Sequence, residues 1–355
     1  MYECPLLGQP DKMADILSDV VLDLHLEIDD RRRVACEVML SKERVFICGE
    51  IDNFEQRGTE EKIRQKLSES GYKQRADGLC SEDCEIIFST SNQSKSLSNA
   101  IGDNLAAGDQ SIVVGFATKE HSSMLPKITF FGKRLAFDLS RESINEKRPD
   151  GKVFVQEALI DGQTKYFVTV SSQHSRSYDD IEFRRGIKTV VDRVFMNELA
   201  PNGLKINPPT GKFSNGGPAA DVGLTGRKLV AESYGPFVPH GGGALSGKDA
   251  TKVDRTGAYA ARCLAKSIVA AGLIETATVF IGYMIGKKSP VHIEIWDGKR
   301  SRPDLSDHVT RNVDLSLGHL IEFFDLRKPQ FVSATECHHY GIVQSLPWEA
   351  QRFEL

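Results

Sequence analysis

The sequence predicts an α+β protein with two or three domains. Its 355 residues exceed the usual size of one domain, which is roughly 150 residues. Helix-type and strand-type apolar patterns recur along the chain in three successive groups. Strand pairs that read as hairpins outnumber strand–helix–strand units, which argues against a doubly wound parallel sheet. An apolar fraction of 40% and a charged fraction of 26% are typical of ordinary globular domains.

The first predicted element is an amphipathic helix over residues 13–28. Asp11 stands at its start, where a carboxylate is favoured by the helix dipole. The apolar residues recur every three or four positions, which is the helical period. They are Met13, Ile16, Leu17, Val20, Val21, Leu24 and Ile28.

The later elements follow from the same patterns. Helices are expected over about 134–147, 183–199 and 255–273. Strands are expected over 34–40, 44–50, 153–160, 166–171, 278–285 and 291–296. The longest apolar stretch, 267–286, carries Glu275 at its centre and Gly272 before it. We interpret it as a helix end, a turn and a strand, so no membrane contact is expected.

Charge and cysteine content exclude several classes of protein. The net charge is 45 − 49 = −4, which argues against a dedicated nucleic-acid binder. The seven cysteines are odd in number and scattered, as expected for reduced thiols in a cytosolic protein. Cys80 and Cys84 are close in sequence, but no second pair follows, so a zinc site is not favoured.

Two segments differ from the rest of the chain. Residues 89–108 are small and polar, which predicts a mobile loop or an ordinary surface linker. Residues 205–255 contain 10 glycines, seven basic and four acidic residues, so this segment carries 7 − 4 = +3. Glycines let backbone N–H groups approach an anion, and Lys and Arg neutralise it. The segment therefore predicts a polyphosphate site, with a glycine-rich turn region bearing solvated charges as the alternative.

Familiar catalytic motifs are absent from the sequence. Residues 242–248 match G-x-x-x-x-G-K, but Asp249 occupies the place of the Ser or Thr of a P-loop, and no apolar strand leads into the glycines. No serine or cysteine nucleophile motif is present. We interpret His174, His338 and His339 as structural. The predicted chemistry is electrostatic, with cations and Mg²⁺ around a phosphate chain.

The glycine-rich segment carries a specific series of motifs. They are Gly216-Gly-Pro218, Gly223-Leu-Thr-Gly-Arg-Lys228, the run from His240 to Asp249, and Lys252-Val-Asp-Arg255. This series resembles the signature of the S-adenosylmethionine synthetases (methionine adenosyltransferases). Further matches extend over nearly the whole chain, including Pro10-Asp-Lys12, Arg33-Val-Ala-Cys-Glu37, Arg148-Pro-Asp-Gly-Lys152 and Glu322-Phe-Phe-Asp-Leu-Arg327.

The resemblance implies three similar α+β domains around a pseudo-threefold axis. It implies segments at 1–92, 105–215 and 216–355, with 93–104 as a mobile active-site loop. It also implies a cytoplasmic homodimer or homotetramer with active sites at the dimer interface. The implied reaction joins the sulfur of L-methionine to C5′ of ATP and releases phosphate and diphosphate. Because a thioether carries no proton, such an enzyme needs positioning and charge neutralisation rather than a general base.

The resemblance also assigns residues to roles. Two Mg²⁺ ions and one K⁺ are expected, with Asp11 and Asp254 as the Mg²⁺ carboxylates and Glu37 as the K⁺ ligand. The expected ATP-binding residues are Asp150, Lys152, Phe213, Asp221, Arg227, Lys228, Ala244, Lys248 and Lys252. The expected methionine-binding residues are Glu50, Asn99, Asp109, Asp221 and Ile285. The expected catalytic residues are Gln9, Lys152, Arg227, Lys248 and Lys252.

Three of the positions depart from the family pattern. Gln9 replaces a histidine that assists the departing triphosphate, Asn99 shortens a glutamine of the loop, and Ser111 replaces a glycine. A glutamine amide can donate a hydrogen bond but cannot carry charge. The leading hypothesis is a divergent S-adenosylmethionine synthetase. The alternatives are an adenosyltransferase for a methionine analogue, and a catalytically weak or regulatory ATP-binding paralogue.

Overall fold

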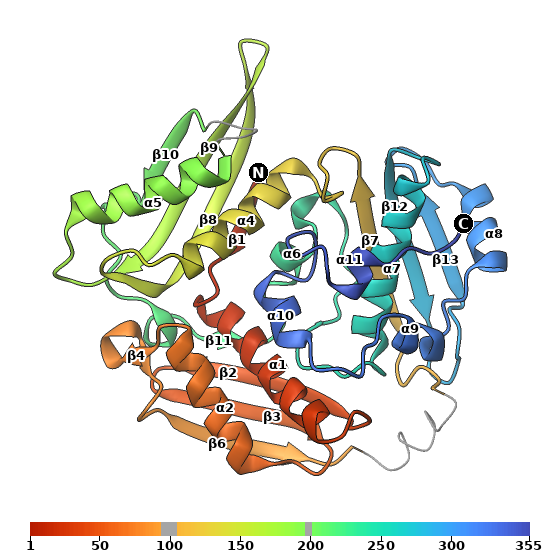
Figure 1. The fold of residues 1–355 in the computed structure, drawn as a ribbon, viewed down its shortest axis with the longest axis horizontal. Helices are drawn as coiled ribbons and strands as arrows, with labels where there is room; N and C mark the ends of the chain where they lie inside the picture. Colours follow the sequence, from red (N-terminus) through yellow and green to blue (C-terminus); the bar gives the residue numbers. More distant parts are fainter. Residues whose placement is uncertain (94–104, 196–200) are drawn as a thin grey trace.

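The computed structural model describes residues 1–93, 105–195 and 201–355 of the chain. It contains three large sheets, each covered by helices (Figure 1). The first sheet has the order β11 (Gly223–Leu224), β2 (Val34–Ser41), β3 (Arg44–Ile51) and β6 (Glu85–Ser91). Helices α1 (Pro10–Ile28) and α2 (Gln56–Glu69) cover it.

The second and third sheets have the same layered construction. The second has the order β1 (Tyr2–Pro5), β8 (Lys147–Ile160), β9 (Gln163–His174) and β10 (Gly203–Ile206), with α4 (Lys127–Arg141) and α5 (Asp180–Phe195). The third has the order β13 (His292–Trp296), β12 (Thr276–Tyr283) and β7 (Ser111–Thr118), with α7 (Val253–Ala270), α8 (Pro303–Asn312) and α9 (Leu317–Phe323).

Short elements complete the fold. A two-stranded ribbon is formed by β4 (Lys73–Gln74) and β5 (Leu79–Cys80). Helices α6 (Leu229–Glu232), α10 (Phe331–Glu336) and α11 (Pro347–Ala350) lie between the sheets, in the middle of the view in Figure 1. Single 3₁₀ turns occur at Arg75–Asp77, Gly217–Ala219 and Gly235–Phe237.

Each large sheet contains one strand from a distant part of the chain. Strand β1, at the N-terminus, pairs with β8, and β11 pairs with β2. Strand β7 pairs with β12, with Ser111 opposite Tyr283. Since strand pairing needs both partners, no sheet is complete without a strand contributed from elsewhere in the sequence. This exchange brings the glycine-rich segment, through β11, onto the first sheet.

The predicted elements are present, with shifted ends. The first helix begins at Pro10 rather than at residue 13, because Pro10 is favoured at the first helical position and Gln9 caps it. The prediction of a helix over 134–147 was wrong at both ends, since α4 runs from Lys127 to Arg141. Its first turns carry the buried residues Ile128 and Phe131, whose spacing belongs to the helix. The stretch 267–286 forms the end of α7, a turn and β12, as predicted.

Polar elements were missed by the apolar patterns. Helix α2 buries only Thr59, Ile63 and Leu67, so it has almost no apolar face to recognise. The predicted loop 89–108 begins inside β6, and its residues 94–104 lie outside the described residues.

None of the described helices is long and apolar enough to cross a membrane. All seven cysteines are free thiols.

Candidate active site

Helix α1 carries four aspartates at a spacing of four residues. We call Asp11, Asp15, Asp19 and Asp23 the aspartate row. A spacing of four places side chains on one helical face, and each carboxylate here accepts a backbone N–H from a later segment. The first three are almost fully buried, at 0%, 1% and 0% exposure. They bind the glycine-rich segment through the N–H groups of Leu224, Gly226 and Gly247, at 3.0, 2.7 and 2.8 Å.

Asp11 lies at the start of α1 beside two cations of the glycine-rich segment. Its Oδ2 accepts a hydrogen bond from Lys228 Nζ, and Arg227 Nε lies 3.4 Å from Oδ1. The Arg227 side chain is 45% exposed and that of Lys228 is 16% exposed, so both can be reached from solvent. A buried anion with accessible cations is an arrangement in which phosphate oxygens can compete for the cations.

Gln9 is buried and engaged by its neighbours. Its Oε1 accepts the N–H of Lys12 at 3.1 Å, which caps α1. Its Nε2 is 3.4 Å from Asp11 Oδ2. Gly8 lies against Pro149, where an added Cβ would be only 2.5 Å from the Pro149 Cβ. This contact places the start of β8, which contains Pro149, beside the N-terminus of α1.

The predicted nucleotide residues Asp150 and Phe213 lie together next to Gly216. A Cβ at Gly216 would meet Asp150 Oδ2 at 2.9 Å and Phe213 Cε2 at 3.1 Å, so the backbone approach requires glycine. Burial raises the pKa of Asp150, although the N–H of Gly217 donates to it at 2.8 Å. His174 Nε2 accepts the Phe213 N–H at 2.8 Å, which is the structural role predicted for this histidine.

Asp254 is held at the start of α7, as Asp11 is held at the start of α1. Each is the second residue of its helix. Ser111 Oγ donates to Asp254 Oδ1 at 2.6 Å, and Lys248 Nζ donates to Oδ2 at 2.5 Å. Gly243 leaves room for the carboxylate, since a Cβ there would lie 2.3 Å from Oδ1. A β-bridge between Ala35 and Lys248 holds this lysine beside β2.

Lys252 and Ala244 extend this second group. Lys252 Nζ lies 3.3 Å from Asp249 Oδ2 and is buried without a hydrogen bond among the described residues. Ala244 packs against Gly226, where an added Cβ would be 2.9 Å away. Glu37 lies on β2, one strand position from Cys36, whose N–H donates to Gly247 O. Desolvation raises the pKa of Glu37, and Lys248 acts in the opposite direction.

The predicted methionine residues are dispersed at the surface. Glu50 lies near the end of β3, opposite Ala35. Asp109 and Asp221 are exposed, and Ile285 is 51% exposed. Asn99 lies outside the described residues. Lys152 lies on β8, opposite Pro5 of β1.

For the argument below we divide the predicted residues into two groups, named after the two helix-initial aspartates. The Asp11 group comprises Gln9, Asp11, Asp150, Lys152, Phe213, Asp221, Arg227 and Lys228. The Asp254 group comprises Glu37, Glu50, Asp109, Ala244, Lys248, Lys252, Asp254 and Ile285. Within the described ranges, no hydrogen bond or ion pair joins a member of one group to a member of the other.

The donor sets of the two groups suit Mg²⁺ that is bound to phosphate. Mg²⁺ is usually held by one or two carboxylates together with substrate phosphates and water, not by an all-protein cage. Asp11 and Asp254 supply such carboxylates, each already paired with a lysine. Accordingly, the described part of the chain contains no cluster of three or more His, Cys, Asp or Glu side chains suited to a metal.

Sequence reasoning missed the roles of several residues. The aspartate row was visible as a spacing of four, but only Asp11 was singled out. Lys12 is buried and forms an ion pair with Glu232, which was not recognised. Ser111 was noted as a departure, but its bond to Asp254 depends on packing of β7 against α7.

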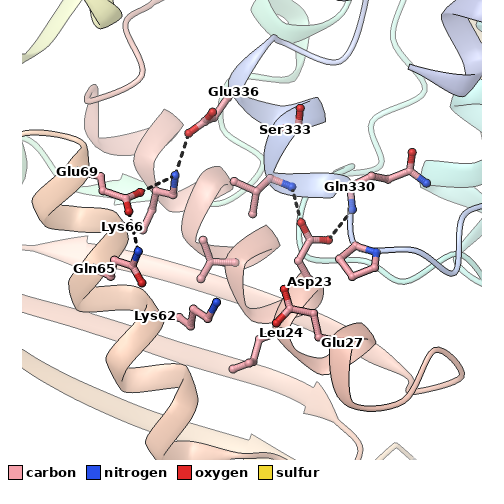
Figure 2. Close-up of a pocket in the computed structure, with 13 residues that line it drawn as sticks. Asp23, Leu24, Glu27, Lys62, Gln65, Lys66, Glu69, Gln330, Ser333 and Glu336 are labelled. Atoms are coloured by element: carbon pink, nitrogen blue, oxygen red, sulfur yellow. Dashed lines mark hydrogen bonds and ion pairs between the residues drawn. The ribbon is translucent and has the colours of Figure 1, made fainter. Parts of the chain in front are cut away.

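Two cavities differ in whether predicted site residues line them. A cavity of about 380 Å³ is lined by Arg227 and Lys228 of the Asp11 group. Another, of about 370 Å³, lies among α1, α2 and α10 and is lined by none of the predicted site residues (Figure 2). There Asp23 accepts the N–H groups of Gln330, Phe331 and Val332 at 3.2, 3.1 and 2.9 Å.

The fold is of the α+β class, and the two groups bring cations of the glycine-rich segment together with carboxylates. Comparisons with known proteins specify the family. Residues 3–95 match the family model described as S-adenosylmethionine synthetase, N-terminal domain. Residues 104–213 match the central domain and residues 215–350 match the C-terminal domain.

Named relatives agree with the family models. The S-adenosylmethionine synthase of Mycoplasma mycoides is 35% identical, over 96% of this chain and 92% of the relative. That of Nitratiruptor sp. is 38% identical over the same shares. The chain belongs to the S-adenosylmethionine synthetase family. The predicted family and the predicted three-domain α+β architecture are therefore confirmed, and the chain is a methionine adenosyltransferase by family.

Proposed function

We propose that this chain makes S-adenosylmethionine from ATP and L-methionine and releases phosphate and diphosphate. The sulfur forms a bond to C5′ as the bond from C5′ to the triphosphate oxygen breaks. Water then hydrolyses the triphosphate. The observation that carries the proposal is the pair of helix-initial carboxylates, Asp11 and Asp254, each bound to a lysine of the glycine-rich segment.

In this proposal the side chains act by charge and position. Lys152, Arg227, Lys228, Lys248 and Lys252 neutralise the triphosphate as negative charge develops on the leaving oxygen. Asp150 and Phe213 hold the nucleoside. Glu50, Asp109, Asp221 and Ile285, with Asn99 of the loop, receive methionine. No general base is required, because the attacking sulfur carries no proton.

Two Mg²⁺ ions and one K⁺ complete the proposed site. Asp11 and Asp254 would hold Mg²⁺, and Glu37 would hold K⁺, because carboxylate oxygens are the ligands these hard cations take. When bound, Mg²⁺ supplies positive charge to the triphosphate oxygens. The lysines that now pair with Asp11 and Asp254 would be released to the phosphates.

The proposal places each active site between two copies of the chain. Support comes from the lack, within the described ranges, of any hydrogen bond or ion pair between the two groups. Apolar side chains around the Asp254 group are also exposed, with Ile112 at 62%, Met284 at 47% and Ile285 at 51%. A homodimer related by a twofold axis would bring the Asp11 group of one copy to the Asp254 group of its partner.

A direct assay tests the activity. Purified protein is incubated with ATP, L-methionine, Mg²⁺ and K⁺, and S-adenosylmethionine is sought by mass spectrometry. Product that requires all four components is the expected result. No product above a protein-free blank would exclude the proposed synthesis. Competition with methionine analogues in the same assay distinguishes methionine from another thioether as the preferred substrate.

Complementation between variants tests the shared site. Asp11→Asn and Asp254→Asn are each expected to be inactive. A heterodimer of the two would contain one site with both native carboxylates. After random exchange of subunits the mixture should regain about a quarter of wild-type activity, since about half the dimers are mixed and each has one intact site. An inactive mixture, with mixed dimers confirmed by mass spectrometry, would contradict the shared site.

A second candidate function is favoured by Gln9. Its amide is engaged with Lys12 N–H and Asp11, and it cannot carry the charge that a histidine could bring to the leaving group. A catalytically weak, ATP-binding paralogue is therefore the alternative. Tight binding of ATP with Mg²⁺ but no turnover, unchanged by Gln9→His, would support it.

We further propose a cytoplasmic location and the segment boundaries stated above. Seven free thiols support a reducing compartment. The three matched family models support divisions near residues 95–104 and 213–215.

A further inference from the structure

A cavity of about 290 Å³ at the C-terminal end of α1 is lined by four arginines. They come from the turn after α1 and from the segment after α9, and they are Arg31, Arg32, Arg33 and Arg327. Leu26 of α1 and Ile321 of α9 line its walls. Two carboxylates, Asp30 and Asp249, also line it, so its ionisable side chains carry 4 − 2 = +2.

Several guanidinium donors of this cavity are unused. Arg33 Nη1 is buried without a hydrogen bond, and its approach to Asp249 Oδ1 is a long 3.9 Å. Arg32 donates from Nη1 to Asn53 O at 3.2 Å, but its Nε is buried without a partner. Arg327 forms no hydrogen bond or ion pair within the described ranges.

The two carboxylates do not saturate these donors. Asp249 already accepts the N–H groups of Val34 and Thr251, both at 2.8 Å, and the Thr251 hydroxyl at 2.6 Å. Asp30 lies 4.0 Å from Arg31 Nε, and both side chains are well exposed. Buried donors without acceptors are costly to the folded protein, so an acceptor brought from solution would be favoured.

We propose that this cavity binds a small phosphoryl anion, orthophosphate or pyrophosphate. Planar guanidinium groups bind tetrahedral oxyanions through paired N–H donors. The excess of two positive charges calls for an anion with more than one negative charge. A cavity of about 290 Å³ has room for one or two phosphoryl groups.

The cavity is separate from the Asp11 group. Asp11 is in the first turn of α1 and Leu26 is in the last, so the helix separates them by about 22 Å at 1.5 Å per residue. Asp249 of the cavity does contact the Asp254 group, since its Oδ2 lies 3.3 Å from Lys252 Nζ. An anion that draws Arg33 away would leave Lys252 as the cation nearest to Asp249. The cavity thus adjoins Lys252, a residue that we assign to triphosphate binding.

Calorimetric titration with pyrophosphate, without Mg²⁺, tests the proposal. Wild-type protein should bind pyrophosphate at the arginine cavity and at the active site. The double variant Arg32→Gln/Arg327→Gln should lose the first event, with affinity at that site falling by about tenfold or more. Lys228→Gln should weaken the other event and keep the arginine-dependent one. A parallel titration with orthophosphate shows whether one phosphoryl group is sufficient.

The matched control is Arg57→Gln, which removes one arginine charge from a side chain that is 89% exposed and that pairs with Glu61. Its isotherm should equal that of wild type. If the double variant gave the same isotherm as Arg57→Gln, the proposed site would be excluded. Because Arg32 and Arg327 are both partly exposed, the variants should fold. The single variants Arg32→Gln and Arg327→Gln provide the same comparison. The readout is binding, so it stays informative even if no S-adenosylmethionine is made.

Discussion

Asp11 and Asp19 lie two turns apart on the same face of α1, and both are completely buried, yet their partners differ. Asp19 faces Arg255, which is also 0% exposed and donates from two nitrogens at 2.7 and 2.6 Å. Asp11 faces Arg227 and Lys228, whose side chains reach solvent. The solvent exposure of the cation thus distinguishes a structural ion pair from an ion pair whose cation a ligand can reach.

The surroundings of Asp19 reinforce the difference. Thr335 Oγ1 and the Gly247 N–H also donate to it, so both oxygens are saturated by protein donors. Burial disfavours the charged form of Arg255, but the Asp19 carboxylate holds the pKa of Arg255 above its usual value. Asp19 therefore joins α1, α7 and α10, whereas Asp11 remains available for chemistry.

The largest expected effect is on stability, at Asp19. Asp19→Ala leaves the Arg255 guanidinium buried without its counter-charge, which costs about 3–5 kcal/mol. Urea unfolding followed by circular dichroism measures the loss. Asp180→Asn, in an exposed ion pair with Arg184, is the control and should change stability by less than about 1 kcal/mol. Equal losses of stability in the two variants would contradict a special structural role for the buried Asp19–Arg255 pair.

The next effect is on activity, at Asp11. Asp11→Asn keeps an acceptor for the Leu224 N–H but loses the charge that would hold Mg²⁺. Turnover should fall by about a thousandfold, or roughly 4 kcal/mol of transition-state stabilisation. The unfolding midpoint should change much less than in Asp19→Ala. A fully active Asp11→Asn protein would remove Asp11 from the site.

A smaller effect is expected at Gln9. Gln9→His introduces a donor that can be charged next to Asp11, and turnover should rise by about 10- to 100-fold. Steady-state kinetics with ATP and methionine measure the gain, and Gln9→Asn is the uncharged control. A fall in turnover in both variants would show that the capping bond from Gln9 Oε1 to Lys12 N–H matters more than charge.

The smallest effect concerns the last member of the aspartate row. Burial raises the pKa of Asp23 to about 7, although three backbone N–H groups donate to it. Above its unfolded pKa of about 3.9, the unfolded chain loses the proton that the folded chain keeps, so stability falls as pH rises from about 4 to 7.

The contribution of Asp23 to this slope is at most about 1.4 kcal/mol per pH unit. Asp23→Asn keeps an acceptor for the N–H groups of α10 but removes the titration. Unfolding free energies measured at pH 4.5, 5.5 and 6.5 should therefore fall less steeply in this variant than in wild type. Identical slopes would show that Asp23 does not titrate in this range.

Local sequence determined much of the fold class and the identity of the family. The period of the apolar residues predicted α1 and α7 to within a few residues, because burial of one helical face imposes that period. The glycine and cation content of residues 205–255 indicated a phosphate site, because glycines let backbone N–H groups approach an anion and Lys and Arg neutralise it. The motif series was specific enough to identify the family.

Only the tertiary structure decided which of these residues meet. Ser111 reaches Asp254 because β7 packs against α7, and no local pattern encodes this contact between residues 143 positions apart. The aspartate row looked uniform in sequence, yet Asp19 pairs with a fully buried arginine, whereas Asp11 pairs with cations that reach solvent. That difference depends on the solvent exposure of Arg255 and Lys228, which is a property of the packed chain and not of either residue.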